Sequence, residues 1–320
     1  MHRRQLLKGG IPLLLAGCSR PISDQGRALV LNNTLPAQTL AQIGRQSGIR
    51  PRLLASRQHI WEQLQQGSRA SVALIGGDWW DGEALRPVPE TWLGTSWWHQ
   101  IPERWQKLVT HGGKVWGIPW RWGVTAIGYR RDLLPFAIEA WEDLWRPELR
   151  RRLTLPDHPL EVIALGQRVV QTEDLGDREL LRRLRQLHGQ VLLYTSADYL
   201  PMLRIGDSWA AVGWSEDLLQ AQRVDARIEV VILPSLVWWD AWVLPQEGAG
   251  DPEAWLGALH QREVLLKAVQ TSRLNTVVPL EVTAPWLIPD AILAASTLSR
   301  PLDREQRQAY WQLWQQIRLT

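Results

Sequence analysis

Apolar residues in this chain occur in short runs that alternate with stretches of helical spacing. Runs at 28–31, 52–55 and 71–75 predict strands, and the stretches at 35–46 and 60–66 have the three-to-four-residue spacing of amphipathic helices. This strand–helix–strand–helix–strand order is typical of an α/β layer with a largely parallel sheet. The hydrophobic pattern alone therefore predicts an α/β fold.

The same alternation continues along the rest of the chain. Two more strands are predicted at 115–119 and 124–129. A second α/β set follows, with strands at 152–155, 191–194, 209–212, 228–233 and 237–244 and helices at 160–170, 178–188, 216–222 and 252–269. The last predicted elements are helices at 290–298 and 304–319. About 300 residues in two such sets are enough for two domains.

The first eighteen residues have the layout of a secretory signal. Arg3, Arg4 and Lys8 form a positive start, a short apolar run follows at 11–16, and the sequence Leu-Ala-Gly-Cys ends at Cys18. This ending resembles the lipobox of bacterial lipoproteins, so we expect residues 1–17 to be removed and Cys18 to be lipidated, with 18–26 as anchor and tether. The Arg3-Arg4 pair also resembles a twin-arginine export signal. Paired arginines occur in ordinary signals too, and both export routes stay open.

Loss of the signal changes how the charge of the chain is interpreted. The net charge is +3, and residues 1–17 carry three positive and no negative groups, so the remaining chain is close to neutral (+3 − 3 = 0). This gives no support for nucleic-acid binding. Cys18 is the only cysteine, which excludes disulfides and thiolate sites from the rest of the chain. No later segment is long and apolar enough to cross a membrane.

Tryptophan replaces the other aromatic residues to an unusual degree. The chain has 21 Trp against four Tyr and one Phe. Some tryptophans must fill the core, but an indole is also the strongest cation–π partner and a broad stacking surface. Their positions therefore matter more than their number.

Four segments in order resemble one family of binding proteins. The segment Gly-Ile-Pro-Trp-Arg-Trp-Gly-Val-Thr-Ala-Ile-Gly-Tyr at 117–129 is similar to a Trp-Gly-x-Thr segment of spermidine/putrescine-binding proteins, the periplasmic receptors of ABC importers. Acidic residues at 157 and 161, the Gly-Trp-Ser turn at 213–215 and the Trp-x-Asp strand at 238–245 agree with other parts of that family. The resemblance covers most of the chain beyond the signal.

The resemblance implies a periplasmic-binding fold of type II. Two α/β lobes would be joined by strands that cross near 125–129 and 238–244, with the ligand trapped between them by hinge closure. It assigns the first lobe to 27–127 plus 240–285 and the second to 128–239 plus 286–320. The expected partners are an organic cation of the polyamine class, a permease and, through Cys18, a membrane. We expect a monomer with no cofactor and no metal.

The chemistry of a polyamine fits several residues at these positions. Trp238 and Asp240 are two apart on a predicted strand, so both leave the same face, and a carboxylate beside an indole suits a cation. Trp214 lies at a strand's carboxyl end, the edge that faces the ligand crevice in α/β sheets. Trp79 stands at another strand end, where the resemblance implies an aromatic wall. Packing in the core remains the alternative for each tryptophan.

The resemblance adds polar candidates and reveals departures. It implies ligand contacts for Glu161, Thr125 and Asp157, and Asn33 follows the first strand toward the same crevice. Glu161 at a helix start is equally explained by the helix dipole. Asn33 and Pro36 stand where aromatic residues are expected, and His158 takes a second acidic position. The ligand is therefore a polyamine, a shorter amine, an amino-acid-like amine or another cation, and Asp78, Glu216 and Asp217 are candidates for replacement charge.

Two other classes of function compete with this interpretation. One is a carbohydrate-active enzyme with a tryptophan-rich cleft, but no acid pair is fixed and no nucleophile elbow, phosphate loop or His-Glu-x-x-His motif occurs. The other is a receptor of the same fold for iron, thiamine or an anion. Iron receptors use tyrosine clusters, and only four tyrosines exist here. An aspartate between tryptophans favours a non-catalytic cation receptor.

Overall fold

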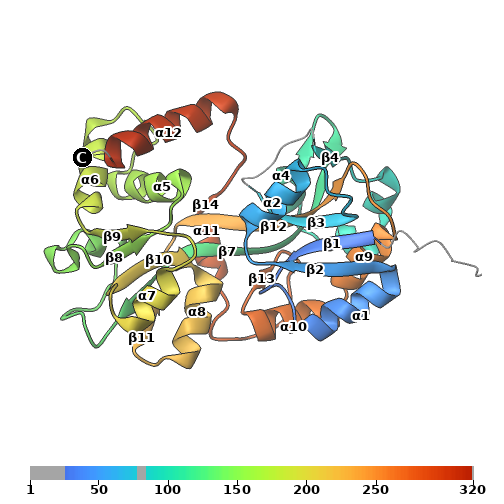
Figure 1. Ribbon diagram of the computed structural model, residues 1–320, viewed down its shortest axis with the longest axis horizontal. Coiled ribbons are helices and arrows are strands. Elements are labelled where there is room, and N and C mark those ends of the chain that lie inside the picture. The colour runs from blue at the N-terminus through green and yellow to red at the C-terminus, as the bar shows by residue number, and fades with distance from the viewer. Residues whose placement is uncertain (1–25, 78–83, 319–320) are drawn as a thin grey trace, which may run out of the picture.

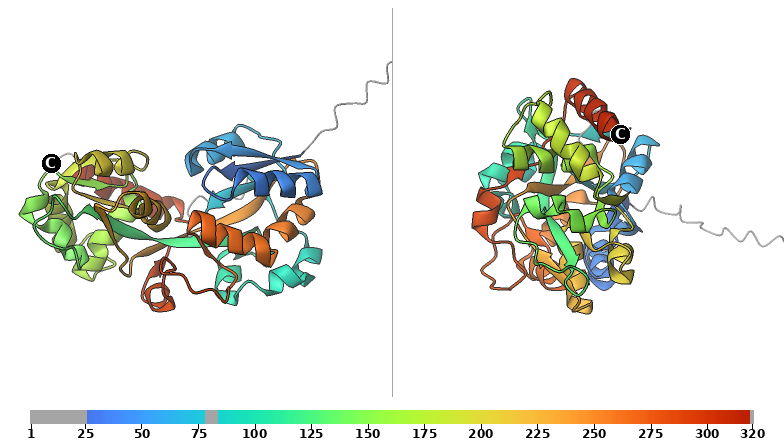
Figure 2. Two further views of the ribbon diagram at one scale, coloured as in Figure 1. Left: turned by 90° about the horizontal axis from the view of Figure 1, so that it is seen from below. Right: turned by 90° about the vertical axis from the view of Figure 1, so that its left-hand side faces the viewer.

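The protein has two α/β lobes joined by long strands (Figure 1). The computed structural model describes residues 26–77 and 84–318. Seen from below, the lobes are two separate groups of helices and strands with a narrow middle where strands cross (Figure 2). The predicted α/β fold in two lobes is confirmed. Residues 1–25, with the expected signal and Cys18, lie outside the described residues.

The first lobe opens with parallel strands whose helices cover the sheet. β1 pairs in parallel with both β2 and β3, as the hydrophobic pattern predicted. Its elements are β1 (Gly26–Leu31), α1 (Ala37–Ser47), β2 (Ile49–Leu54), α2 (Arg57–Gln65), β3 (Val72–Gly76), β4 (Leu85–Arg86), η2 (Glu90–Gly94), α3 (Ser96–His99), α4 (Glu103–Leu108), β5 (Thr110–His111) and β6 (Lys114–Val115). Chain that returns later to this lobe forms α9 (Pro252–Leu259), α10 (Arg262–Ser272) and β13 (Asn275–Thr276).

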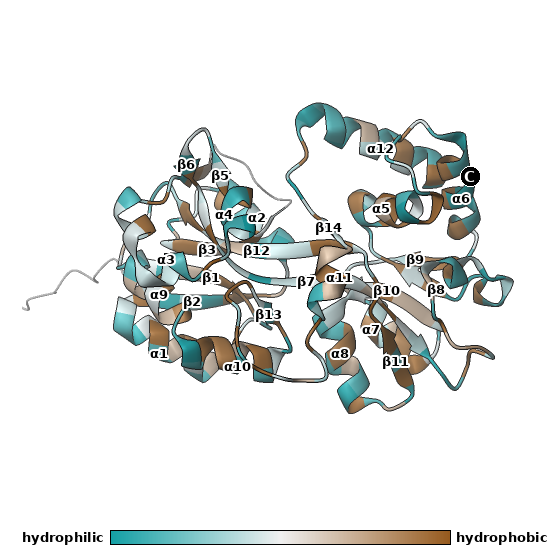
Figure 3. Ribbon diagram, turned by 180° about the vertical axis from the view of Figure 1, so that it is seen from behind, coloured by the Kyte–Doolittle hydropathy of each residue, from teal (hydrophilic) through white to brown (hydrophobic). Residues whose placement is uncertain are grey.

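The second lobe repeats the plan around its own strands. β8 pairs in parallel with β9 and β10. Its elements are η3 (Trp141–Trp145), η4 (Pro147–Leu149), β8 (Leu153–Leu155), α5 (Pro159–Val170), α6 (Arg178–His188), β9 (Val191–Tyr194), α7 (Tyr199–Ile205), β10 (Ala210–Trp214), α8 (Ser215–Val224), β11 (Ile228–Val231) and α12 (Arg304–Arg318). Brown and teal alternate along the covering helices (Figure 3), as expected of helices with one buried face.

Two long antiparallel strands connect the lobes. They are β7 (Gly117–Arg130) and β12 (Leu236–Pro245), and every residue of both is buried. The sheet order is β2-β1-β3-β12-β7-β10-β8-β9, so this pair lies at its centre. β7 leaves the hydrophobic core of the first lobe after Val124 and joins the cores of the second from Ala126 onward. Polar side chains on this pair therefore face the junction of the lobes.

Tryptophan fills much of the core, as its number required. Trp105, Trp120, Trp239, Trp242, Trp255 and Trp314 are almost fully buried. Trp242 meets Trp120 and Trp255 edge-on, with ring centroids 6.1 and 5.9 Å apart. This edge-to-face geometry is the favoured one for aromatic pairs. These six tryptophans are structural, so their number in the chain is not by itself a sign of ligand contacts.

Three predictions differ from the structure, and no element was predicted for helices α3, α4 and α7. Strands expected at 115–119 and 124–129 are, from Gly117 onward, one strand, β7, because β12 pairs with it on both sides of a bulge at Trp120. The helix expected at 252–269 is two, α9 and α10, which are separated at Gln261. The helix expected at 290–298 ends at Ala294 as α11 (Asp290–Ala294), and β14 (Thr297–Leu298) pairs with β12.

The segment after α10 crosses between the lobes. Ile288 and Leu293 belong to the core of the first lobe, whereas Leu313, Trp314 and Ile317 of α12 belong to the second.

None of the described helices is both long and apolar enough to span a membrane.

Candidate functional site

One face of the β7–β12 pair carries a row of polar and aromatic side chains. Asp240 is opposite Arg121, and Trp238 is opposite Gly123. Directly opposed residues of antiparallel strands share a face, and side chains two apart along a strand do too. Thr125 therefore continues the row toward the second lobe.

Asp240 is the centre of a buried ion cluster. Its side chain is fully buried, and Arg57 at the start of α2 binds it with both ends of the guanidinium fork, Nε–Oδ1 at 2.8 Å and Nη2–Oδ2 at 3.1 Å. Arg121 adds a bond from Nε to Oδ2 at 2.6 Å. Burial alone raises the pKa of Asp240, but the charges and hydrogen bonds of Arg57 and Arg121 outweigh burial and lower it. Asp240 is thus an ionised carboxylate that already holds two cations.

Two tryptophans enclose the Arg57 guanidinium. Its Cζ lies 4.9 Å from the ring centroid of Trp214 and 4.9 Å from that of Trp238. Gly123 makes room for this arrangement, because a Cβ there would lie 2.2 Å from Cζ2 of Trp238. Arg57 belongs to the first lobe and Trp214 ends β10 of the second, so this stack is a contact between lobes.

Glu216 lies beside this cluster at the start of α8. Its side chain is buried, and burial together with the neighbouring Asp217 raises its pKa to about 8, although Arg121 and Arg57 oppose that rise. Asp217 accepts hydrogen bonds from Tyr199, at 2.8 Å, and from Asn33 of the first lobe, at 3.5 Å. The second lobe therefore supplies two more acidic groups to the junction.

The pH dependence of stability reports the state of Glu216. Because its pKa is about 8 in the folded protein and near 4.5 when exposed, the folded state binds more protons, and stability falls as pH rises through that window. We expect Glu216→Gln to remove this fall. Denaturant unfolding from pH 6.5 to 9 measures it, above the range of buried His260, whose pKa burial lowers to about 4. Exposed Glu305→Gln is the control, and equal slopes in both variants would contradict the assignment.

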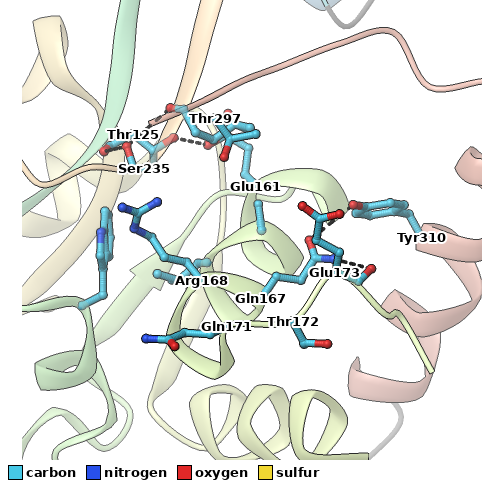
Figure 4. A pocket seen from close by; sticks show the side chains of 14 residues that line it. Thr125, Glu161, Gln167, Arg168, Gln171, Thr172, Glu173, Ser235, Thr297 and Tyr310 are labelled. Carbon is cyan, nitrogen blue, oxygen red and sulfur yellow. Dashed lines mark hydrogen bonds between the residues drawn. The ribbon is translucent and has the colours of Figure 1, made fainter. Parts of the chain in front are cut away.

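A second group of polar side chains lines a cavity at the end of the row in the second lobe (Figure 4). The cavity has a volume of about 490 Å³. Thr125 donates a hydrogen bond from Oγ1 to Oε2 of Glu161, at 2.6 Å, and Glu161 is in the first turn of α5. Arg168, Glu173 and Tyr310 are further lining residues. The charged side chains that line the cavity are two carboxylates, Glu161 and Glu173, and one guanidinium, Arg168.

The structure thus divides the predicted site residues into two neighbouring groups. Trp214, Trp238 and Asp240 meet in the ion cluster, and Thr125 and Glu161 meet in the cavity. Asn33, which was predicted to lie toward the crevice, contacts Asp217 of the second lobe. Asp157 is exposed and binds Arg318 at 3.0 Å. Trp79, like Cys18, lies outside the described residues.

The two arginines of the cluster, Arg57 and Arg121, were not predicted from the sequence. Arg121 lies within the 117–129 segment and alternates onto the face of Trp238, so strand parity was a signal that could have found it. Arg57 is 183 residues from Asp240, and nothing in the local pattern of α2 marks it. The described residues include no cluster of three His, Cys, Asp or Glu side chains able to hold a metal.

The fold and the site together define the class of protein. Two α/β lobes with a polar junction on crossing strands are the architecture of solute-binding proteins, in which a ligand lies between lobes. The chain belongs to the family of bacterial extracellular solute-binding proteins, whose sequence profile matches residues 62–260. Family and fold are those of solute-binding proteins and not of enzymes.

Individual relatives agree with this assignment. The spermidine/putrescine-binding periplasmic protein of Salmonella typhimurium is 28% identical over 138 residues, which are 41% of this chain and 40% of the relative. The match therefore spans about two fifths of that relative. A spermidine/putrescine ABC transporter substrate-binding protein from Streptococcus pneumoniae superposes with a TM-score of 0.77 at 18% identity, over 93% of this chain and 99% of that one. A lipoprotein of Treponema pallidum gives 0.76 at 15% identity, over 92% and 99%. The predicted fold of type II is thereby confirmed.

Proposed function

We propose that the protein is the solute-binding component of an ABC importer and that it binds an organic cation of the polyamine class between its lobes. One observation carries the choice of a cation: two indole faces and a buried carboxylate already enclose a guanidinium at the junction. Indole faces and carboxylates both attract cations, and the attraction strengthens where water is excluded.

Two carboxylates at a distance from each other set the length of amine that the row could hold. Asp240 binds Arg121, and Glu161 binds Thr125, four residues further along β7. At roughly 3.3 Å per residue the two strand positions are about 13 Å apart. An extended triamine spans such a distance, and a short diamine reaches only one of the two carboxylates. The length of the amine that binds therefore depends on which of the two carboxylates the ligand can reach.

The same proposal includes the export and anchoring of the protein, the bounds of its lobes and a further aromatic contact. Residues 1–17 would direct export by the general or the twin-arginine route, and lipid on Cys18 would anchor a periplasmic or extracytoplasmic monomer beside its permease. The lobes would comprise 27–127 plus 240–285 and 128–239 plus 286–320, except that Ile288 and Leu293 pack in the core of the first lobe. Trp79 would complete an aromatic wall. The similarity to periplasmic relatives supports this location.

Calorimetry with putrescine and spermidine tests the proposed function. We expect micromolar affinity for at least one of them, equivalent to about −8 kcal/mol. The same titration with small carboxylates tests a second candidate, a receptor for a zwitterion or an anion. That candidate is favoured by the two terminal nitrogens of buried Arg121, which have no hydrogen-bond partner among the described residues. Binding of a carboxylate without either amine would contradict the cation receptor.

A further inference from the structure

Arg57 has the contacts that a ligand cation would make. Its guanidinium lies between Trp214 and Trp238, each centroid 4.9 Å away, and forms a two-point bond with Asp240. Its side chain is only 13% exposed. The aromatic walls and the carboxylate of this position are therefore filled by the protein itself.

The origin of Arg57 makes this occupation a tether between lobes. It is the first residue of α2 and follows Ser56, whose side chain accepts a hydrogen bond from the His59 backbone and fixes the start of the helix. From that fixed point in the first lobe the side chain reaches Trp214 of the second lobe. Because the cation is covalently attached, its effective concentration at the site is high and a free ammonium competes at a disadvantage.

The geometry points to Arg57 as a built-in occupant of the cation position formed by Trp214, Trp238 and Asp240, which we call the inner position. The ligand is then restricted to an outer position, at Glu161 and Thr125. This inference rests on the proposed function and makes its substrate class narrower. The outer cavity, of about 490 Å³, then takes an amine with one cationic head or a short diamine. A long polyamine meets a positive charge where its second ammonium would bind, and like charges repel.

Removal of Arg57 is the direct test. Arg57→Ala deletes the atoms of one ethylguanidinium ion and leaves Asp240 paired with Arg121. We expect two results: ethylguanidinium stabilises the variant in a saturable thermal shift but has no such effect on the wild type, and spermidine binds the variant at least about tenfold more tightly by calorimetry. A gain in affinity of about tenfold corresponds to one added hydrogen bond to a charged group at the lower end of its usual contribution, about 1.5 kcal/mol.

Two further variants make the test specific. Arg183→Ala is the matched control, because Arg183 also lies over an indole, 5.5 Å from the Trp145 centroid, at a site remote from Asp240. It should show neither effect. Arg57→Lys covers the case in which Arg57→Ala does not fold, since lysine keeps the charge but lacks the planar fork and is displaced more easily. Spermidine affinity should rise in this variant as well.

The outcomes separate this inference from the proposed function. A folded Arg57→Ala that ethylguanidinium does not stabilise, and whose spermidine affinity is unchanged, overturns the role of Arg57. Rescue by ethylguanidinium with no amine bound by any form of the protein keeps the role of Arg57 and overturns the cation receptor.

Discussion

Asp240→Asn is expected to lower the free energy of unfolding by about 3–5 kcal/mol, the usual cost of removing one partner from a buried ion cluster. Arg57 and Arg121 both converge on this carboxylate at 2.6–3.1 Å, and its side chain is fully buried. Without the negative charge two guanidinium groups face each other in a poorly hydrated space. Chemical denaturation at neutral pH measures the loss.

A matched control separates this effect from the loss of any Asp–Arg pair. Asp132 is also bound by a guanidinium fork, that of Arg130 at 2.7 Å, but the aspartate side chain is 41% exposed. Water screens that pair, so Asp132→Asn should cost much less. Equal losses in the two variants would show that the burial of the cluster does not determine its contribution. Replacement of Arg57, Arg121 and Asp240 together by apolar residues of similar size should restore much of the stability.

Glu161→Gln is expected to weaken amine binding by about 10- to 100-fold, because a charge-assisted hydrogen bond contributes about 1.5–3 kcal/mol. Glu161 faces the cavity from the first turn of α5, and Thr125 orients it through the bond at 2.6 Å. Glutamine keeps the shape and the bond from Thr125 but removes the charge. Calorimetry with the amine that the wild type binds best gives the change directly.

The neighbouring acidic residue provides the control for this experiment. Asp157 precedes the same helix, but it is exposed and binds Arg318. Asp157→Asn should leave amine affinity within about twofold, as expected for a screened surface charge. An equal loss in both variants would mean that the general negative potential of this region, and not a contact with Glu161, attracts the ligand.

Local pattern was enough to predict most elements of the fold. The strand and helix at 178–194 were predicted with the bounds that α6 and β9 have, since an amphipathic period and an apolar run are local properties. Two of the elements that differed, β7 and β14, depend on a partner far away in the chain. β7 is continuous through polar Arg121 because β12 pairs along it. β14 is a strand because it pairs with residues 236–237 of β12, on which β3 does not pair.

The candidate site shows the same division. Parity along a strand placed Trp238 and Asp240 on one face from the sequence alone, and the structure agrees. The choice between Glu161 and Asp157 required tertiary structure, because Asp157 precedes the helix whose first turn contains Glu161. In the folded protein Glu161 lies toward the cavity and Thr125, whereas Asp157 binds Arg318 of α12.

The sequence by itself determined the α/β alternation, the family and the residues on one face of each strand, because these follow from side-chain period and short motifs. The expected signal and lipidated Cys18 also come from the sequence alone and stay predictions. Only the tertiary structure decided what Asp240 binds. A carboxylate carries no information about which cation will reach it, and the fold brings Arg57 to it from 183 residues away. An aspartate that the sequence offers to a ligand is, in the folded protein, already paired with an arginine of the chain itself.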